Sequence, residues 1–211
     1  MVMEEELNNK LIDVLPIIQE RKMNENLYFV IKTFKSPLDL WIYQEIIFSI
    51  KPDIIIEIGN AYGGSLLALA HFLDNINHGK IIGVDIGHFP IDEFVKKHPR
   101  ITLKSGDACE LFDEVKELVG AKDKVLIIED SSHEYDNTIN VLRKYGDLVS
   151  IGSYFIVEDG ICHHGLEVGP DPGPYEAITD FIKENDRFIS DRAKESFLIT
   201  WNPKGYLKRI K

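Results

Sequence analysis

Apolar residues at helical spacing dominate the first fifty positions of the chain. The first such pattern starts at Leu7, and a second one covers residues 39–50. Pro52 follows the second pattern and favours its end, because proline cannot continue a helix. We therefore expect a helical extension over residues 1–50, lying on the rest of the domain or on a neighbouring subunit.

From residue 51 onward the pattern changes to short runs of Val, Ile and Leu that alternate with helical stretches. The expected strands are residues 53–59, 80–86, 101–107, 124–130 and 153–159. The expected helices are residues 66–73, 109–119, 135–149 and 174–185. Strands that are apolar along their whole length indicate a parallel sheet covered by helices on both faces. Residues 197–203, followed by 205–207, predict an antiparallel strand that closes the sheet, so 51–211 forms a doubly wound α/β core and 1–211 a single domain.

A glycine-rich turn, residues 57–65, joins the first strand of this core to its helix. Ligands of open α/β sheets bind at the carboxyl ends of the strands, where glycines permit close approach and the next helix offers free amides. The spacing of Gly59 from Gly63–Gly64 differs from the G-x-G-x-x-G pattern of dinucleotide sites, which disfavours NAD. Asp85 and Asp107 end the next two strands, and a carboxylate at Asp85 can accept both hydroxyls of a ribose. The turn and these acids together predict a nucleoside site.

Carboxylates also end the fourth and fifth strands, at Asp130 and at the Glu158–Asp159 pair. Neighbouring strands lie about 5 Å apart, so these three acids should converge at one edge of the sheet. Like charges at one place need a cation, and oxygen ligands of this number suit Mg²⁺. His133 follows Asp130 by three positions and is a candidate general base for a substrate hydroxyl. The histidine pair at 163–164 is a second-choice contact for substrate or metal.

The composition is that of a globular protein, with 44% hydrophobic and 28% charged residues. The 35 acidic and 24 basic side chains give a formal net charge of −11, which makes nucleic acid and anionic lipid surfaces poor partners. No apolar run reaches the roughly 20 residues that span a bilayer. The acidic N-terminus lacks the basic start of an export signal, so we expect a cytoplasmic protein. Its two cysteines, Cys109 and Cys162, are then ordinary thiols.

Taken together, these motifs resemble the cephalosporin hydroxylase and rhamnosyl or macrolide-sugar O-methyltransferase family. Glu57 belongs to an E-x-G-x-x-x-G sequence that looks like the first motif of class I S-adenosylmethionine-dependent methyltransferases. The likeness runs in order from about residue 35 to the C-terminus. Its segments include SPLDLWIYQEII (36–47), KPDIIIEIGNAYGGS (51–65), LIIEDSSHEYDN (126–137), LVSIGSYFIVED (148–159), GPDPGPYEAI (169–178) and FLITWNPKGYLKRI (197–210).

The resemblance implies a seven-stranded, mostly parallel Rossmann-like methyltransferase sheet with an antiparallel C-terminal strand. It implies S-adenosylmethionine as methyl donor, Mg²⁺ as metal, and a hydroxyl of a sugar or glycosylated metabolite as acceptor. The implied donor-binding residues are Glu57, Gly59, Gly63, Ser65, Asp85, Asp107 and Asp130. The implied metal ligands are Asp130, Glu158 and Asp159, and the implied base is His133. The chain departs from the family pattern at Ser131–Ser132, where the pattern has a serine–aspartate pair, and at His163–His164.

Other functions stay open on the sequence. A hydroxylase or oxygenase could use an iron site built from His133, one acid, and either His163 or His164. An NAD-linked oxidoreductase is disfavoured by the glycine spacing, and a catalytically silent nucleoside-binding partner would bind the donor without transferring its methyl group. The apolar N-terminal helix favours subunit contacts and hence a homo-oligomer.

Overall fold

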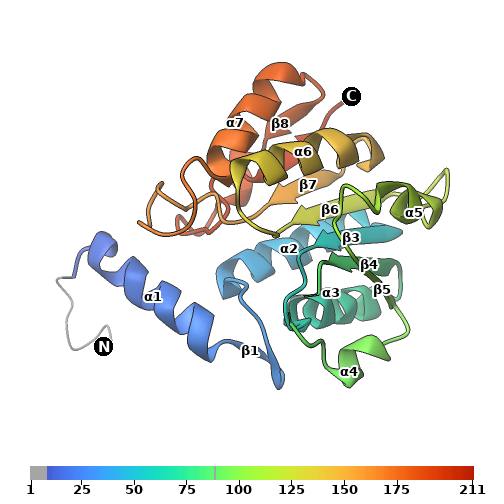
Figure 1. Cartoon of the computed structure of the whole chain (residues 1–211), viewed down its shortest axis with the longest axis horizontal. Helices are drawn as coiled ribbons and strands as arrows, with labels where there is room; N and C mark the ends of the chain where they lie inside the picture. Colours follow the sequence, from blue (N-terminus) through green and yellow to red (C-terminus); the bar gives the residue numbers. More distant parts are fainter. Residues whose placement is uncertain (1–8, 88) are drawn as a thin grey trace.

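A seven-stranded sheet with strand order β5-β4-β3-β6-β7-β9-β8 forms the centre of the computed structural model, which describes residues 9–87 and 89–211 (Figure 1). The strands are β3 (Ile54–Ile58), β4 (Lys80–Asp85), β5 (Ile101–Ser105), β6 (Val125–Glu129), β7 (Tyr154–Val157), β8 (Phe188–Ser190) and β9 (Tyr206–Arg209). Strands β3 to β7 pair in parallel, whereas β9 runs antiparallel to both β7 and β8. The doubly wound α/β sheet predicted from the sequence is confirmed.

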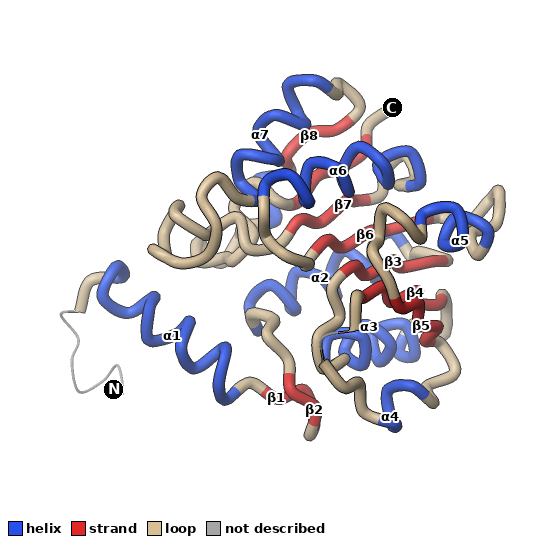
Figure 2. Tube along the Cα trace, viewed as in Figure 1, coloured by secondary structure: helices blue, strands red, loops and turns tan. Residues whose placement is uncertain are grey.

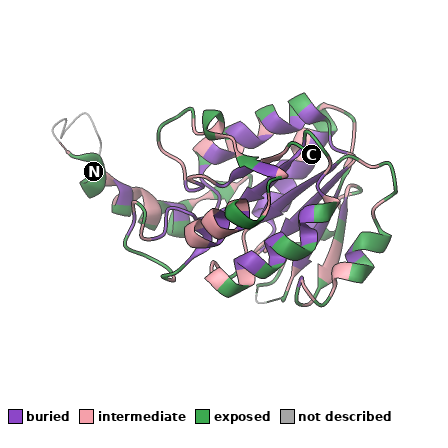
Figure 3. Cartoon of the chain, turned by 90° about the horizontal axis from the view of Figure 1, so that it is seen from above, coloured by how far each residue is buried: buried purple, intermediate pink, exposed green. Residues whose placement is uncertain are grey.

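Helices cover both faces of this sheet, as the expected alternation of elements requires (Figure 2). They are α2 (Pro37–Ile50), α3 (Gly64–Asn75), α4 (Glu93–Lys96), α5 (Phe112–Glu117), α6 (Tyr135–Tyr145) and α7 (Pro174–Glu184). One face packs against α2, α3 and α4, and the other packs against α5, α6 and α7. Every residue of β3, β6 and β7 is buried between these layers (Figure 3).

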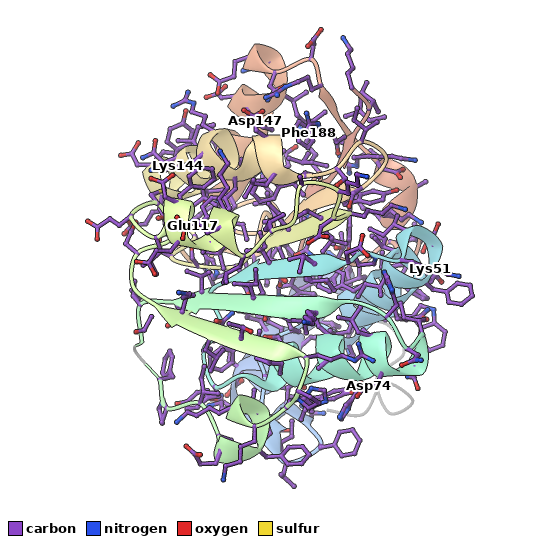
Figure 4. The ribbon with its side chains drawn as sticks, turned by 90° about the vertical axis from the view of Figure 1, so that its right-hand side faces the viewer. Lys51, Asp74, Glu117, Lys144, Asp147 and Phe188 are labelled. Carbon is purple, nitrogen blue, oxygen red and sulfur yellow. The ribbon has the colours of Figure 1, made fainter. Side chains whose placement is uncertain are left out.

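Strand register brings the carboxyl ends of the parallel strands to one level. In β3, Ile58 pairs with Val84 of β4 and with Glu129 of β6, and Glu129 in turn pairs with Val157 of β7. The loops that follow these strands therefore meet at one edge of the sheet. Figure 4 shows the opposite edge, where Lys51 ends α2 and Asp74 lies in the last turn of α3.

The N-terminal part lies beside the carboxyl edge of the sheet, outside the two helical layers (Figure 1). It consists of α1 (Leu11–Glu25) and a short hairpin of β1 (Leu27–Tyr28) and β2 (Ile31–Lys32). Leu15 of α1 is buried in a small cluster with Ile161, Leu166 and Trp201, so this helix packs on loops from the second half of the chain. Leu7, which opened the expected first helix, lies outside the described residues.

Residues 197–203 do not form the strand that we expected, because this segment wraps around a buried carboxylate instead. Asp39 of α2 accepts hydrogen bonds from the backbone N–H of Trp201 at 2.9 Å and from the hydroxyl of Tyr206 at 2.8 Å, and it also bonds to the Thr200 hydroxyl. The closing strand β9 begins only at Tyr206. Strand β8 and the short helix α4 were also not expected from the sequence. No helix within residues 9–87 and 89–211 has both the length and the apolar character that crossing a bilayer requires.

Candidate active site

A cavity of about 460 Å³ opens at the carboxyl edge of the sheet. This volume lies within the range of small-molecule sites, roughly 300–1,000 Å³. Loops after β3, β4, β5, β6 and β7 form its floor, and residues of α1 and of the loop 162–169 line it as well. Six of the residues selected from the sequence line it: Gly59, Asp85, Asp107, Asp130, His133 and Asp159.

Asp85 holds the glycine-rich loop at one end of this cavity. Its Oδ2 accepts hydrogen bonds from the backbone N–H groups of Asn60 at 2.7 Å and Ala61 at 3.1 Å, and its Oδ1 accepts one from Gly87 at 2.6 Å. Asp107 lies at the next strand end, where its Oδ1 accepts from the N–H of Glu110. A nucleoside in this part of the cavity would meet one carboxylate from each of two adjacent strands.

Gly59 cannot be replaced without moving the neighbouring loop. Its φ is +87°, and a Cβ atom there would lie 1.9 Å from the carbonyl oxygen of Asp130. The turn after β3 and the turn after β6 are thus in direct backbone contact, which requires glycine. This contact joins the end of the cavity that carries Asp85 to the end that carries Asp130.

Three of the expected donor residues lie beneath the loop and do not line the cavity. Glu57 is fully buried, and the Ser65 hydroxyl donates to its Oε2 at 3.0 Å. Burial raises the pKa of Glu57, although Lys35 and Ser65 act in the opposite direction. The Cβ position of Gly63 faces Ile91 and Val95. In this structure these residues support the loop from the protein interior and do not line the cavity.

Asp130, His133 and Asp159 bring their polar atoms together at the other end of the cavity. The Nε2 of His133 lies 3.1 Å from both Oδ1 of Asp130 and Oδ2 of Asp159, and the three possible ligand atoms lie within 4.8 Å of one another. Burial lowers the pKa of His133, but the charge of Asp159 and the hydrogen bond to Asp130 outweigh it and raise this pKa to about 9. The two carboxylates therefore hold the ring as an imidazolium.

Lys35 is a site residue that was not expected from the sequence. Its Nζ lies 2.6 Å from Oδ2 of Asp130, bonds to Oε1 of Glu158, and lies 3.2 Å from Oε1 of Glu57. Burial lowers the pKa of Lys35, yet the charges of these three acids hold it well above its usual range. The converging acids did predict a positive charge at this place, because buried carboxylates need a cation. The sequence did not indicate that a lysine would supply this charge, or which one.

Glu158 differs from the other expected metal ligands in its surroundings. It is 5% exposed and does not line the cavity. Lys35 holds one of its oxygens, and the hydroxyl of Tyr43 also hydrogen-bonds to its side chain. Asn202 in turn donates to that hydroxyl at 2.8 Å. The structure thus gathers Asp130 and Asp159 at the cavity and turns Glu158 toward Lys35.

A second lysine, Lys22 of α1, approaches the same group from the other side. Its Nζ lies 3.6 Å from Oδ1 of Asp159 and 5.4 Å from the ring centre of Trp201. Lys22 lines the cavity together with Gln19 and Met23 of the same helix. The N-terminal helix therefore contributes polar and apolar side chains to the end of the cavity that holds Asp159.

The remaining histidines of the expected iron site lie elsewhere. His163 contacts the carbonyl oxygen of Gly169 at 3.1 Å, and His164 contacts Glu176 at 2.6 Å and stacks on Tyr175. Neither is among the described residues that line the cavity. The group of possible ligands at the cavity contains one histidine, whereas an iron triad needs two.

A second group of possible metal ligands lies away from the cavity, at His71, Asp74 and His98. Both oxygens of Asp74 already have partners in this arrangement. Its Oδ1 accepts from Nε of Arg100 at 2.5 Å, and its Oδ2 lies 3.2 Å from Nε2 of His98. These contacts tie the end of α3 to the start of β5.

Residues 20–210 match the family described as rhamnosyl O-methyltransferase/CmcI. The rhamnosyl O-methyltransferase of Mycobacterium tuberculosis is 31% identical over 189 residues, which cover 86% of this chain and 77% of that protein. The rhamnosyl O-methyltransferase of Mycobacterium leprae is 31% identical over 193 residues, which cover 88% of this chain and 84% of that protein.

Solved structures show the same fold. A CmcI structure described as holding Mg and SAM superposes with a TM-score of 0.66 at 23% identity, over 85% of this chain and 74% of that one. An O-methyltransferase from Bacillus cereus, in complex with SAH, superposes with a TM-score of 0.54 at 15% identity, over 88% and 85% of the two chains. The resemblance noted in the sequence is confirmed, and the chain belongs to the rhamnosyl O-methyltransferase/CmcI family.

Proposed function

We propose that this protein is an S-adenosylmethionine-dependent O-methyltransferase that acts, with Mg²⁺, on a hydroxyl of a sugar or glycosylated small molecule. Family membership supports the methyl transfer, and the names of the rhamnosyl relatives support a sugar-bearing acceptor. The observation that carries the proposal is that one cavity joins a nucleoside-type end, at Asp85 and Asp107, to a cation-type end, at Asp130 and Asp159.

The donor end fits the chemistry of S-adenosylmethionine. Ile86, Phe89 and Ala108 supply apolar surface for an adenine ring, and Asp85 supplies a carboxylate for ribose hydroxyls. The donor-binding residues that we propose are Glu57, Gly59, Gly63, Ser65, Asp85, Asp107 and Asp130. Of these, Glu57, Gly63 and Ser65 act by holding the loop in place.

The cation end fits a divalent metal ion because carboxylate oxygens gather there, and these are the ligands that hard cations such as Mg²⁺ prefer. We propose Asp130, Glu158 and Asp159 as the ligands. Asp130 and Asp159 already line the cavity, whereas one oxygen of Glu158 is held by Lys35. The backbone supports a functional role for this place, since His133 and Asp159 both have positive φ, at 61° and 53°.

When bound, the donor supplies a methyl group activated by its sulfonium, and the metal ion supplies positive charge that lowers the pKa of an acceptor hydroxyl. The chain itself contributes the base and the alignment. The Nε2 of His133 is the proton acceptor, but Asp130 and Asp159 keep it protonated in the arrangement described. His133 can therefore act as a base only when another cation pairs with those carboxylates.

The N-terminal extension serves the acceptor in this proposal. Residues 51–211 supply the donor and metal residues, and α1 of the N-terminal extension lines the opposite end of the cavity. Gln19, Lys22 and Met23 offer hydrogen-bonding and apolar contacts there, and Val168 of the loop 162–169 lines the same cavity. A hydroxyl-rich molecule with an apolar portion suits such a lining.

Titration calorimetry with S-adenosylmethionine, its demethylated product and NAD tests the donor part of the proposal. We expect binding of the first two and none of NAD. Methyl transfer to a panel of rhamnosides and other glycosides, with and without EDTA, tests the metal and the acceptor class. Asp159→Asn should abolish the Mg²⁺-dependent turnover and leave donor affinity intact. Donor binding without any methyl transfer would favour a silent binding partner, and consumption of O₂ would favour an oxygenase.

A further inference from the structure

Lys35 introduces a positive charge directly beside the proposed metal site. It shares the Asp130 carboxylate with the cavity, because Nζ of Lys35 contacts Oδ2 of Asp130 while Oδ1 of the same group faces His133. It also holds Glu158, the third proposed ligand, by one oxygen. Lys35 and a divalent ion at this place would therefore bind the same two carboxylates, those of Asp130 and Glu158.

The fold fixes the lysine in this position. The backbone N–H of Lys35 donates to the Thr33 hydroxyl at 3.3 Å, and the side-chain amide of Asn26 donates to the Lys35 carbonyl at 3.1 Å. Directly after it, Ser36 caps the first turn of α2. These contacts hold the Lys35 backbone, and its side chain is 3% exposed, so the ammonium group is buried among the carboxylates.

Charge balance explains why the lysine is there. Glu57, Asp130 and Glu158 are all close to one ammonium group, and two of them are at least nine-tenths buried. Buried carboxylates without a cation are strongly destabilising, so Lys35 allows the site to fold without a bound ion. The same charge repels any further cation at Asp130, because Coulomb repulsion acts over a few ångströms in this water-poor setting.

We propose that Lys35 is a positioning residue that competes with the divalent cation for Asp130 and Glu158 and thereby limits the affinity of the metal site. This inference rests on the metal site of the proposed function. Glu158 pairs with Lys35, and Asp130 is shared between Lys35 and the divalent ion. The result is a site whose buried carboxylates are partly compensated without the metal ion, and which binds that ion reversibly.

Calorimetric titration of Mg²⁺ into the full-length, EDTA-treated protein tests the inference on the Lys35→Met variant. Methionine keeps the length of the side chain and removes its charge. We expect Mg²⁺ to bind about tenfold more tightly or better, because the repelling charge is gone and Glu158 is released. Unchanged or weaker Mg²⁺ binding by the folded variant would overturn the inference.

Lys124→Met is the matched control for loss of a positive charge. Lys124 lies at the opposite edge of the sheet. Its Nζ donates to the carbonyl oxygen of Ile50 at 2.8 Å, and its backbone N–H donates to Oδ2 of Asp53 at 2.7 Å. This variant should bind Mg²⁺ as the wild type does. Tighter binding in both lysine variants would reflect net charge alone and would also overturn the inference.

The double variant Lys35→Met/Glu158→Gln covers the case in which Lys35→Met does not fold. It removes one positive and one negative charge, so the net charge of the buried group does not change. We expect its Mg²⁺ affinity to stay within about threefold of the wild type, because the two charges it removes act on the ion in opposite directions. A loss of tenfold or more would mean that Glu158 binds the ion independently of Lys35, and the inference would fail.

Donor binding, measured on the same samples, separates this inference from the proposed function. If S-adenosylmethionine binds but no variant binds Mg²⁺, both the inference and the metal part of the proposed function fail. If the variants respond to Mg²⁺ as expected but none binds the donor, the proposed methyl transfer fails and the competition by Lys35 stands.

Discussion

The imidazole of His133 and the carboxylate of Asp159 face each other at the cavity, with Nε2 and Oδ2 3.1 Å apart and a left-handed backbone at both residues. Such conformations cost of order 1–3 kcal/mol each for residues other than glycine, so the surrounding structure must impose them. Asn202 supports the Asp159 side by accepting from its backbone N–H at 3.3 Å. The contact between His133 and Asp159 therefore depends on the loop after β7, which is held in turn by Asn202 from a distant part of the chain.

Replacement of His133 tests its role as the base. We expect His133→Asn to lower turnover by about 10²–10⁴-fold, the usual contribution of a general base, with donor binding unchanged. Asparagine is the informative choice, because it tolerates positive φ and can keep a hydrogen bond but cannot accept the proton. Turnover with a glycoside acceptor and calorimetry with the donor give the two readouts. Turnover near that of the wild type in His133→Asn would mean that water takes the proton.

The stability of the metal-free protein should fall as the pH rises through the titration of His133. Burial lowers this pKa, but Asp159 and Asp130 raise it overall, from 6.5 to about 9. A raised folded-state pKa stabilises the fold fully below pH 6.5, and this stabilisation is lost as the pH rises through 9. Urea unfolding in EDTA across that interval measures the loss. The decline should be smaller in His133→Asn, and equal declines in both proteins would contradict the assignment.

Two glycines with similar backbone angles allow the loop contact at Gly59 to be separated from simple strain. Gly59 and Gly152 have φ of +87° and +84°, but a Cβ at Gly152 meets no atom within 4 Å. Gly152→Ala should therefore cost only the conformational strain, about 1–2 kcal/mol, and leave donor affinity unchanged. Gly59→Ala should cost more and weaken donor binding, because the new Cβ displaces the Asp130 turn. Urea unfolding and donor titration of both variants make the comparison.

Much of the sheet and of its functional edge could be predicted because the relevant signals are local. Strands β3, β6 and β7 are continuous apolar runs, and a parallel sheet places whatever follows them at one edge. Asp85, Asp130 and Asp159 are found at that edge for this reason. The residue types that end the strands predicted a nucleoside and a divalent cation as ligands, and the binding role of each residue stays a prediction.

The parts that could not be predicted depend on contacts between distant segments. Lys35 meets Asp130 and Glu158 across separations of 95 and 123 residues, and no local pattern distinguishes it from other lysines. The segment 197–203 has the composition of a strand, but its Thr200 and Trp201 bond to Asp39, over 160 residues away. In both cases a buried charge decides the local structure, and hydrophobic periodicity carries no information about it.

Asp85 provides the last test, of whether the donor end of the cavity binds a ligand or only holds a loop. Asp85→Asn removes the charge and leaves one acceptor oxygen for the three N–H groups that now bond to the carboxylate. Hydrogen bonds to charged groups contribute about 1.5–3 kcal/mol, so we expect donor affinity to fall by roughly 10- to 100-fold.

Asp53→Asn is the control, because Asp53 also accepts from a backbone N–H, that of Lys124 at 2.7 Å, but lies at the opposite end of β3. Donor titration calorimetry and thermal unfolding should be run on both variants. The control should lose some stability and keep its donor affinity, and Mg²⁺ affinity should be similar in both, since neither residue contacts the Asp130–His133–Asp159 group. If Asp85→Asn binds the donor as tightly as the control does, the carboxylate of Asp85 serves only to hold the Asn60–Ala61 turn. The donor would then be recognised through Asp107 and the exposed backbone of the loop.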